Sequence, residues 1–362
     1  MTRMLDCAAV RTYLVTGGAG FIGSNLVHQL LREEQDCRVI VLDKLSYAGN
    51  VENLESLESD GRFELVRGDI CDRALVRATI ERVQPSVILN LAAESHVDRS
   101  IDGPAEFVRT NVLGAFEMLD AALEHYRALS AEAKSAFRFV HVSTDEVYGS
   151  LGAEGRFTEA SRYEPNSPYS ATKAGADHLA RAYFRTYGLP VVTTNCSNNY
   201  GPFQFPEKLV PLVTLNAVEG KPLPVYGEGR NIRDWLFVED HCDGLRLAAA
   251  RGVPGETYNL GGNCELTTLD VVHAVCDALE ELRPRREGAY RDLISFVKDR
   301  PGHDFRYAID ATKIEQELGW QPRTAFHQGL RHTVAWYLEH LPWCERASAR
   351  YQRERLGLGR AS

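Results

Sequence analysis

The chain has 362 residues, 44% of them hydrophobic and 25% charged, which is the balance of a globular protein with a substantial core. Its formal net charge of −9 argues against a broad nucleic-acid surface but is compatible with a local cationic pocket for a small anion. The eight cysteines include no C-x-x-C pair, and no apolar run is long enough to span a bilayer. These features predict a cytoplasmic protein without a signal peptide, a metal site or a membrane partner.

A glycine-rich turn follows the first predicted strand, Tyr13–Thr16. Gly18, Gly20 and Gly23 satisfy the pattern G-x-G-x-x-G, and an amphipathic helix is predicted over Ser24–Arg32. Such glycines permit a tight turn, close approach of a pyrophosphate to the backbone and close packing of helix on strand. The helix N-terminus adds free N–H groups and a positive dipole end. Glycines that are merely structural remain the alternative reading of this motif.

An acidic residue ends the second predicted strand, Arg38–Leu42. Asp43 comes twenty residues after Gly23, the spacing at which a carboxylate binds the adenosine ribose hydroxyls of a dinucleotide. Its charge would repel a 2′-phosphate, so the pattern favours NAD over NADP, although the neighbouring Lys44 weakens this inference.

Two more strand–helix units are predicted in the first half of the chain. A strand at Phe63–Val66 ends near Asp69 and Ile70, which are placed to touch an adenine edge. A strand at Val87–Leu91 opens into A-A-E-S-H-V-D-R-S, where small side chains let a dinucleotide lie close to the backbone. This alternation of strands and helices predicts a parallel, doubly wound α/β sheet.

The segment after the fourth predicted strand leads from cofactor to substrate. Ser95 and His96 are expected to reach beyond the dinucleotide, although His96 could equally be a hydrogen-bonded structural histidine. A long helix is predicted over Asn111–Ala128, with Thr110 at its start as a cap or a cofactor contact.

We predict the chemistry at Val140–Gly149, V-H-V-S-T-D-E-V-Y-G, where a buried strand ends. Thr144, Asp145 and Glu146 come at its carboxyl end, the edge at which ligands of open parallel sheets bind. Two adjacent acids in an enclosed site can acquire different pKa values and so provide one acid and one base. The alternative is that both carboxylates cap a turn in water.

A tyrosine–lysine pair heads the next predicted helix, which runs to Tyr187 after a loop, Gly149–Pro168, expected to cover the site. The four-residue spacing of Tyr169 and Lys173 places phenol and ammonium on one helix face. With a positive nicotinamide ring nearby, Lys173 would lower the pKa of Tyr169 and let it act as a base.

These motifs resemble those of the extended short-chain dehydrogenase/reductase family, over about Thr12–Trp343. The glycine motif, the Thr144 position and the Tyr169/Lys173 pair are shared by many members. Narrower are D-K-L-S-Y-A-G-N, A-A-E-S-H-V-D-R-S, T-D-E-V-Y-G and R-P-G-H-D, which resemble motifs of the members that dehydrate nucleotide sugars. The Asp145–Glu146 pair is the discriminating feature, because the related 4-epimerases have no such pair there.

The resemblance implies a reaction and roles for these residues. It implies that dTDP-D-glucose becomes its 4-keto-6-deoxy derivative while NAD stays bound. Tyr169, assisted by Thr144 and Lys173, would take the proton of the 4-hydroxyl while hydride passes from C4 to NAD. Glu146 would remove the C5 proton, and Asp145 would protonate the departing 6-hydroxyl. Hydride would then return to C6 while a proton arrives at C5.

The same resemblance assigns a cofactor set and a substrate set. The cofactor set is Gly17, Gly20, Phe21, Ile22, Gly23, Asp43, Lys44, Ser46, Asp69, Ile70, Leu91, Ala92, Ala93, Ser95, Thr110, Tyr169, Lys173 and Asn199. The substrate set is Ser95, His96, Thr144, Asn198, Lys208, Leu209, Pro224, Val225, Tyr226, Arg233, Thr268, Arg300 and His303. In it, Arg233 and Arg300 are the expected diphosphate clamps. At Thr268 the family more often has asparagine, which leaves that contact open.

The second half predicts a smaller, discontinuous α/β domain. Strands are expected at Pro190–Asn195 and Thr257–Leu260, so residues 1–197 and 235–263 would form a Rossmann-type NAD domain. Residues 198–234 and 264–362 would bind the nucleotide sugar, and the tail from Glu345 would be partly mobile. Apolar residues on several faces of the helices Asn111–Ala128 and Tyr169–Tyr187 predict a homodimer through a four-helix bundle.

Two other readings remain open at this point. One is a 4,6-dehydratase or 4-epimerase that acts on another nucleotide sugar. The other is a catalytically silent NAD-binding protein, which the complete set of Thr144, Asp145, Glu146, Tyr169 and Lys173 disfavours because a scaffold needs no acid and base together.

Overall fold

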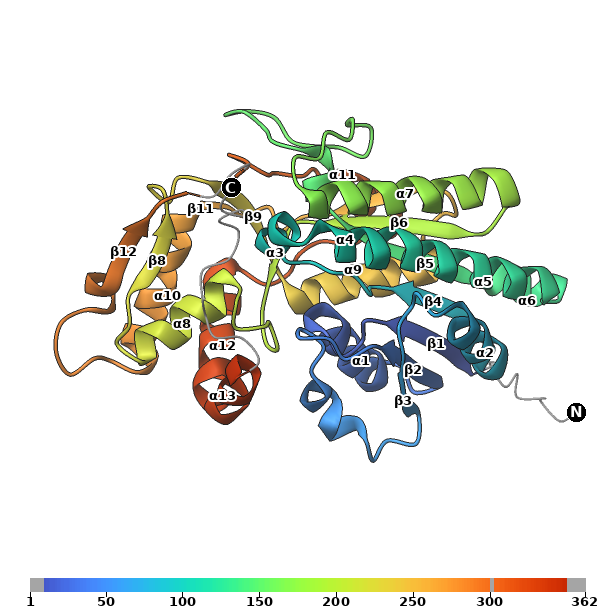
Figure 1. Ribbon diagram of the computed structural model, residues 1–362, viewed down its shortest axis with the longest axis horizontal. Coiled ribbons are helices and arrows are strands. Elements are labelled where there is room, and N and C mark those ends of the chain that lie inside the picture. Colours follow the sequence, from blue (N-terminus) through green and yellow to red (C-terminus); the bar gives the residue numbers. More distant parts are fainter. Residues whose placement is uncertain (1–9, 300–302, 350–362) are drawn as a thin grey trace, which may run out of the picture.

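The computed structural model describes residues 10–299 and 303–349, and its larger lobe is built on a seven-stranded parallel sheet (Figure 1). The strands are β1 (Arg11–Thr16), β2 (Cys37–Asp43), β3 (Phe63–Arg67), β4 (Val87–Asn90), β5 (Arg138–Thr144), β6 (Val191–Cys196) and β10 (Thr257–Leu260). Their order is β10-β6-β5-β4-β1-β2-β3. The chain therefore changes direction across the sheet between β1 and β4, where doubly wound sheets bind their ligands. The predicted fold class is confirmed.

Helices cover both faces of this sheet and bury a separate core under each. Successive strand residues alternate between the cores, so that Leu14 packs on one face and Val15 on the other. The helices on the Val15 side are α1 (Phe21–Glu33), α9 (Val238–Arg251) and α11 (Thr312–Leu318). Those on the Leu14 side are α2 (Arg73–Val83), α5 (Ala115–Ala128) and α7 (Pro168–Tyr187), with the short α6 (Ala131–Ala136) after α5.

A smaller lobe lies beside the carboxyl ends of the strands and has its own core (Figure 1). It contains a three-stranded sheet, β11-β9-β7, and a parallel pair, β12-β8. The domain boundary predicted between 234 and 235 falls inside β9, which pairs only with strands of the small sheet. The elements are β7 (Asn198–Tyr200), α8 (Leu209–Val218), β8 (Leu223–Tyr226), β9 (Ile232–Phe237), β11 (Glu265–Thr267), α10 (Thr268–Leu282), β12 (Ile294–Val297) and α12 (Phe326–Glu339).

The helix predicted from Asn111 begins earlier and is irregular. After α3 (Val97–Asp102), α4 (Pro104–Phe107) starts with proline at its first position, where the missing N–H costs nothing. A π-helical segment, Val108–Gly114, then joins it to α5. Thr110 therefore lies inside a continuous helical run and caps nothing, so the predicted start was wrong. The spacing of apolar residues cannot reveal a π turn, because a π turn is defined by backbone hydrogen bonds between residues five apart in place of four.

The loop between the acid pair and α7 does not cover the pocket as predicted. Leu151 forms a β-bridge with Arg306, and Phe157 forms one with Ile309. Both apolar side chains pack beside Tyr148, and no residue from 150 to 167 lines the pocket. Their burial against the returning chain near residue 308 decides where the loop lies.

The start of the predicted mobile tail is instead helical, because α13 (Leu341–Ala349) includes Glu345 and buries Trp343, Cys344 and Ala347. The indole N–H of Trp343 donates to Asn53 Oδ1 at 3.0 Å, which ties α13 to the larger lobe. The polar composition of the tail hides this apolar helix face. The rest of the predicted tail, residues 350–362, lies outside the described residues.

Two kinds of feature are absent from the described part of the chain. Over residues 10–299 and 303–349, no helix is long and apolar enough to cross a membrane. Over the same residues, no three histidine, cysteine or carboxylate side chains are grouped so that they could hold a metal ion.

Candidate active site

A cavity of about 300 Å³ opens at the carboxyl ends of β1, β2, β4, β5 and β6. It extends from the glycine-rich turn before α1 to the acid pair after β5, and residues of the smaller lobe close it on the far side. Its position is the crevice where the strand order reverses, as expected for a dinucleotide site in a doubly wound sheet.

The glycine-rich turn is shaped for close backbone approach. Gly17 has φ +68°, and a Cβ there would lie 2.8 Å from Ala92 Cα. A Cβ on Gly23 would lie 2.2 Å from the carbonyl oxygen of Gly17. Gly20 caps α1 without a side chain, and the first turn of α1 carries no acid, so its N–H groups and positive dipole end suit a pyrophosphate. These residues fit a dinucleotide.

We expect Gly23→Ala to weaken cofactor binding about 5–150-fold, because overpacking at a rigid backbone contact costs ~1–3 kcal/mol. The matched control is Gly61→Ala, whose Cβ would meet no atom within 4 Å. Fluorescence titration and the cofactor content of the purified proteins measure the difference. Equal binding by both variants would contradict the role given to the turn.

Asp43 and Lys44 line the part of the cavity where the adenosine ribose of a dinucleotide is expected. The carboxylate of Asp43 is buried and accepts hydrogen bonds from the backbone N–H groups of Ala19 (3.0 Å) and Leu45 (2.7 Å), which leaves acceptor capacity for ribose hydroxyls. The ammonium of Lys44 lies 3.0 Å from Glu94 and 3.3 Å from Glu106. Its charge is thus already paired, which strengthens the prediction of NAD.

The acid pair begins where β5 ends. Thr144 Oγ1 accepts from the backbone N–H of Glu146 and donates to Asp145 Oδ1, both at 3.3 Å. Asp145 is 2% exposed, and its Oδ2 has no hydrogen-bond partner among the described residues. Burial raises the pKa of Asp145 well above its ordinary value, and the charges of Glu146 and Asp234 raise it further. The arrangement therefore favours a protonated Asp145.

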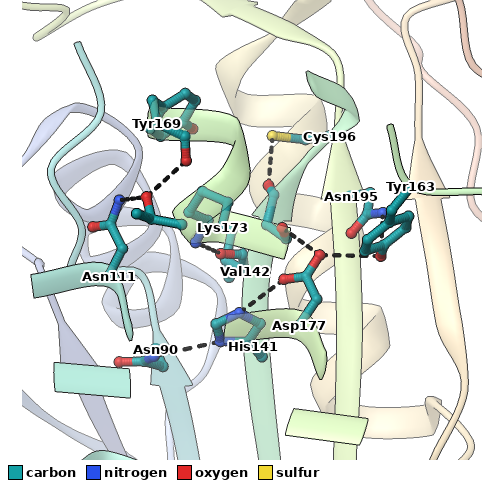
Figure 2. A network of polar contacts seen from close by, with 12 residues as sticks. Asn90, Asn111, His141, Val142, Tyr163, Tyr169, Lys173, Asp177, Asn195 and Cys196 are labelled. Carbon is teal, nitrogen blue, oxygen red and sulfur yellow. Dashed lines mark hydrogen bonds and ion pairs between the residues drawn. The ribbon is translucent and has the colours of Figure 1, made fainter. Parts of the chain in front are cut away.

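The start of α7 places Tyr169 and Lys173 beside this pair. Ser167 and Ser170 form a capping box that fixes the first turn of the helix. The ammonium of Lys173 donates to the carbonyl of Val142 at 2.7 Å (Figure 2). Burial raises the pKa of Tyr169 well above its ordinary value, with Glu146 as the second cause. The lowered pKa of Tyr169 that we predicted from the neighbouring Lys173 is therefore not found in the protein without its cofactor.

The cavity brings together most of the residues selected from the sequence. All five predicted catalytic residues and every member of the predicted cofactor set line it. Four of the predicted substrate residues also line it: Ser95, Thr144, Asn198 and Lys208.

Other members of the predicted substrate set lie outside the lining. His96 caps α3 by accepting from the backbone N–H of Arg99 at 3.3 Å, which is the structural role left open for it. Arg233 donates to the carbonyls of Ile232 at 2.7 Å and Asp304 at 3.0 Å, so a phosphate would compete with these acceptors. Arg300 lies outside the described residues.

The remaining substrate candidates lie in the smaller lobe. Val225 is fully buried in that lobe's core, and the neighbouring side chains of β8 point the opposite way because strand residues alternate. The hydroxyl of Tyr226 donates to Asp98 at 3.3 Å, and its ring meets His303 edge-on. Thr268 begins α10 and donates to the carbonyl of Asn231 at 3.4 Å. Pro224 is part of β8, and Leu209 begins α8.

Some residues that line the cavity were not predicted from the sequence. The segment 204–208 contributes Gln204, Phe205 and Glu207 beside Lys208, and Tyr337 holds this segment by donating to the carbonyl of Gln204 at 2.6 Å. This segment could have been found from the sequence, because it directly precedes the predicted substrate residue Lys208. The other missed lining residues are Leu42, Ala48, Gly49, Gly68, Val142, Ser143 and Cys196.

The dinucleotide cradle and the acid–base set at one sheet edge define a Rossmann-fold enzyme that couples redox chemistry to proton transfer. A family model described as GDP-mannose 4,6 dehydratase matches residues 14–333, and the chain belongs to this family. The resemblance to nucleotide-sugar dehydratases drawn from the motifs is confirmed by relatives of both known sequence and known structure.

Two curated relatives are described as dTDP-glucose 4,6-dehydratases. The chain is 55% identical over 348 residues to that of Xanthomonas campestris pv. campestris (strain B100), covering 96% of this chain and 99% of the relative. It is 52% identical over 356 residues to that of Neisseria meningitidis serogroup B (strain ATCC BAA-335 / MC58), covering 97% and 100%.

The chain is also similar to solved structures of nucleotide-sugar enzymes. Streptomyces venezuelae DesIV, a dTDP-glucose 4,6-dehydratase with NAD and TYD bound, is 47% identical with a TM-score of 0.85, covering 93% of this chain and 99% of that one. A Thermus thermophilus UDP-glucose 4-epimerase complex with NAD is 28% identical with a TM-score of 0.79, covering 91% and 99%. Dehydratases and epimerases thus share this fold, and the residues of the site must separate them.

Proposed function

We propose that the protein is a dTDP-glucose 4,6-dehydratase, which converts dTDP-D-glucose to dTDP-4-keto-6-deoxy-D-glucose and water with tightly bound NAD. The observation that carries the proposal is the buried Asp145 next to Glu146, directly after Thr144 and in the same cavity as Tyr169. A 4-epimerase moves hydride at one carbon and needs no acid and base for eliminating water. The similarity to two dTDP-glucose 4,6-dehydratases at 52–55% identity supports the same substrate.

The first proton transfer belongs to Tyr169. Its phenolate oxygen takes the proton of the sugar 4-hydroxyl, and Thr144 donates a hydrogen bond to the same sugar oxygen. Bound NAD would accept hydride from C4, return it to C6 and bring a positive nicotinamide ring close to Tyr169. Because burial and Glu146 raise the pKa of Tyr169 in the chain alone, the phenol needs nearby positive charge before it can act as a base.

Elimination uses the two carboxyl groups in opposite protonation states. Once C4 is a ketone, the C5 proton is acidic, and the ionised Glu146 removes it. The carboxyl of Asp145 is held protonated by burial and by two neighbouring carboxylates, and it gives its proton to the departing 6-hydroxyl. One acid and one base at adjacent positions therefore serve a single loss of water.

The nucleotide end of the substrate is proposed to lie toward the smaller lobe. Asn198 and Lys208 line the cavity there, and Lys208 also donates to the carbonyl of Ser95 across the cleft at 3.2 Å. The proposed remainder of the substrate site is His96, Leu209, Pro224, Tyr226, Arg233, Thr268, Arg300 and His303, together with the backbone of Val225, whose side chain is fully buried. We also keep as proposals the division into an NAD lobe and a sugar-nucleotide lobe, and a cytoplasmic location. The seven cysteines of the described residues are free thiols, which supports that location.

The test is incubation of the purified protein with dTDP-glucose without added NAD, followed by NMR of the product. A 4-keto-6-deoxy sugar supports the proposal, and formation without added cofactor supports tight NAD binding. UDP-glucose in a parallel reaction tests the base preference. Epimerised sugar, or unchanged substrate from protein that contains NAD, would refute the proposal.

We further propose a homodimer through a four-helix bundle, and predict that Leu113→Asp converts it to a monomer. Four apolar residues of the two helices, Phe116, Leu119, Leu179 and Phe184, pack in or against the subunit's own core. The exposed apolar residues are instead Val108 (53%), Leu113 (45%) and Tyr187 (49%). Burying a carboxylate at such a contact opposes association. Light scattering at micromolar concentration measures the state, and Val253→Asp, at a residue also 49% exposed, is the control. A monomeric parent protein would end this proposal.

A further inference from the structure

A buried carboxylate lies one helical turn below the proposed catalytic pair. Tyr169, Lys173 and Asp177 follow one another at four-residue spacing on α7, so all three occupy one face of the helix (Figure 2). Asp177 is 5% exposed, and it is not among the residues that line the cavity. It therefore cannot contact substrate or cofactor, and any effect it has on the reaction must act through another residue.

Three donors hold the carboxylate of Asp177. It accepts from Ser143 Oγ at 2.8 Å, from the hydroxyl of Tyr163 at 3.0 Å and from His141 Nε2 at 3.1 Å. A side-chain amide of Asn90 lies 3.5 Å from His141 Nδ1, which suits an imidazole with its proton on Nε2. None of these donors brings a positive charge, since burial lowers the pKa of His141 and keeps its ring neutral.

The positive charge near Asp177 is that of Lys173. This ammonium is itself buried, 6% exposed, and it donates to a neutral acceptor, the carbonyl of Val142. Burial lowers the pKa of Lys173, whereas the charge of Asp177 raises it. Figure 2 shows the ammonium of Lys173 directed to Val142 and the carboxylate of Asp177 directed to His141, two residues of the same strand β5.

We propose that Asp177 is a positioning residue for the dehydration: as a buried counter-ion fixed by Ser143, Tyr163 and His141, it keeps Lys173 protonated beside Tyr169. The inference rests on the proposed function, because that function gives Lys173 its role beside the base. It adds a residue remote from the reacting atoms whose charge, and not its shape, is required.

Other titratable groups also surround Lys173 and Tyr169. From β6 comes Cys196, whose pKa burial raises to about 12, so it stays a thiol near neutral pH. From the turn after β5 come Glu146, whose charge acts on Tyr169, and Asp145, whose neutral form is favoured by burial. From β5 comes His141, which is neutral. The helical run before α5 contributes the uncharged Asn111, which donates to Thr172 at 3.0 Å. Asp177 is thus the charge that most strongly opposes the loss of the Lys173 proton.

The test is the pH dependence of kcat/KM, which reports the ionisation of the enzyme before substrate binds. In Asp177→Asn, the alkaline limb should move to lower pH by about one to three units, the usual effect of a nearby opposite charge. Asp177→Ser, a second neutral replacement, should move it in the same direction. Asp177→Glu should leave the alkaline limb within about half a pH unit of the parent, because glutamate restores the negative charge near Lys173. Tyr163→Phe is the matched control, because it removes an uncharged hydrogen bond to the same carboxylate.

The outcomes separate this inference from the proposed function. A parent enzyme that does not dehydrate dTDP-glucose refutes the proposed function, and the inference with it. An active parent with an unchanged alkaline limb in both neutral variants overturns the inference alone. So does an equal shift in Tyr163→Phe, or failure of both neutral variants to fold, because Asp177 would then be a structural residue that holds α7 on the sheet. A shift confined to the neutral variants supports it.

Discussion

Tyr169→Phe is expected to lower turnover of dTDP-glucose by ~10²–10⁴-fold, the usual cost of losing a general base. The phenylalanine keeps the ring and its edge-on contact with Phe107, whose centroid lies 6.4 Å away. The loop Gly17–Gly23 is untouched, so the amount of cofactor bound per chain should not change. Turnover by product NMR and cofactor content of the purified variant measure these two quantities separately.

The matched control for this variant is Tyr183→Phe. Tyr183 is also buried on α7, and its hydroxyl donates to Asp120 at 3.4 Å, away from the cavity. It should retain the turnover of the parent enzyme. If Tyr169→Phe kept more than about a tenth of that turnover, the general base would have to be another residue.

The Asp145→Asn and Glu146→Gln variants should oxidise the sugar but fail to dehydrate it. Each change keeps the size of the side chain and removes its proton chemistry, while Tyr169 and Lys173 remain. We expect product formation to fall ~10²–10⁴-fold in both, and reduced cofactor to accumulate when substrate is added. Stopped-flow absorbance of the reduced nicotinamide follows the first step, and product NMR follows the second.

Solvent deuterium at C5 separates the two carboxyl groups from each other. Glu146→Gln should suppress exchange at C5, because the base that removes this proton is gone. Asp145→Asn should affect exchange less, since its proton is needed at the C6 oxygen. Mass spectrometry of the recovered sugar measures the exchange. Normal dehydration by both variants would return the acids to the alternative role of capping the turn that begins at Thr144.

The sign of the pKa shift at Asp145 gives these expectations a physical basis. Its folded pKa is raised, so the carboxyl holds its proton at pH values where an exposed aspartate has lost it. The amide introduced by Asp145→Asn would mimic the shape of that neutral carboxyl without a transferable proton. The fold should therefore tolerate this substitution better than the reaction does.

Sequence reasoning succeeded where a local pattern carries the constraint. Fixed spacings along the chain place side chains at the same site. Examples are the glycine motif Gly18–Gly23, the acid Asp43 and the pair Tyr169 and Lys173. The alternation of apolar strands with helices likewise predicts the parallel sheet. All the predicted cofactor and catalytic residues consequently lie around one cavity.

What sequence reasoning missed depends on contacts between distant segments. Arg233 remains a proposed phosphate contact, but no sequence pattern predicts that folding brings the carbonyl of Asp304 close enough to accept from its guanidinium. Val225 lies in a promising stretch, yet the pairing of β8 with β12 turns its side chain into the core. Asp177 carries no recognisable motif, because its three donors come from two strand residues and a loop tyrosine.

The docking of α13 on Asn53 has a consequence for the order of events during synthesis. The strands up to β6 and the glycine-rich turn can assemble while later residues are still being translated. The wall formed by residues 204–208 cannot be secured then, because Tyr337 and Trp343 are among the last described residues of the chain. Contacts across such separations are also among the slower ones to form. The cofactor chamber is therefore closed only after residues 337–343 have been translated, and a ribosome-bound fragment that ends before them carries the cradle without its outer wall.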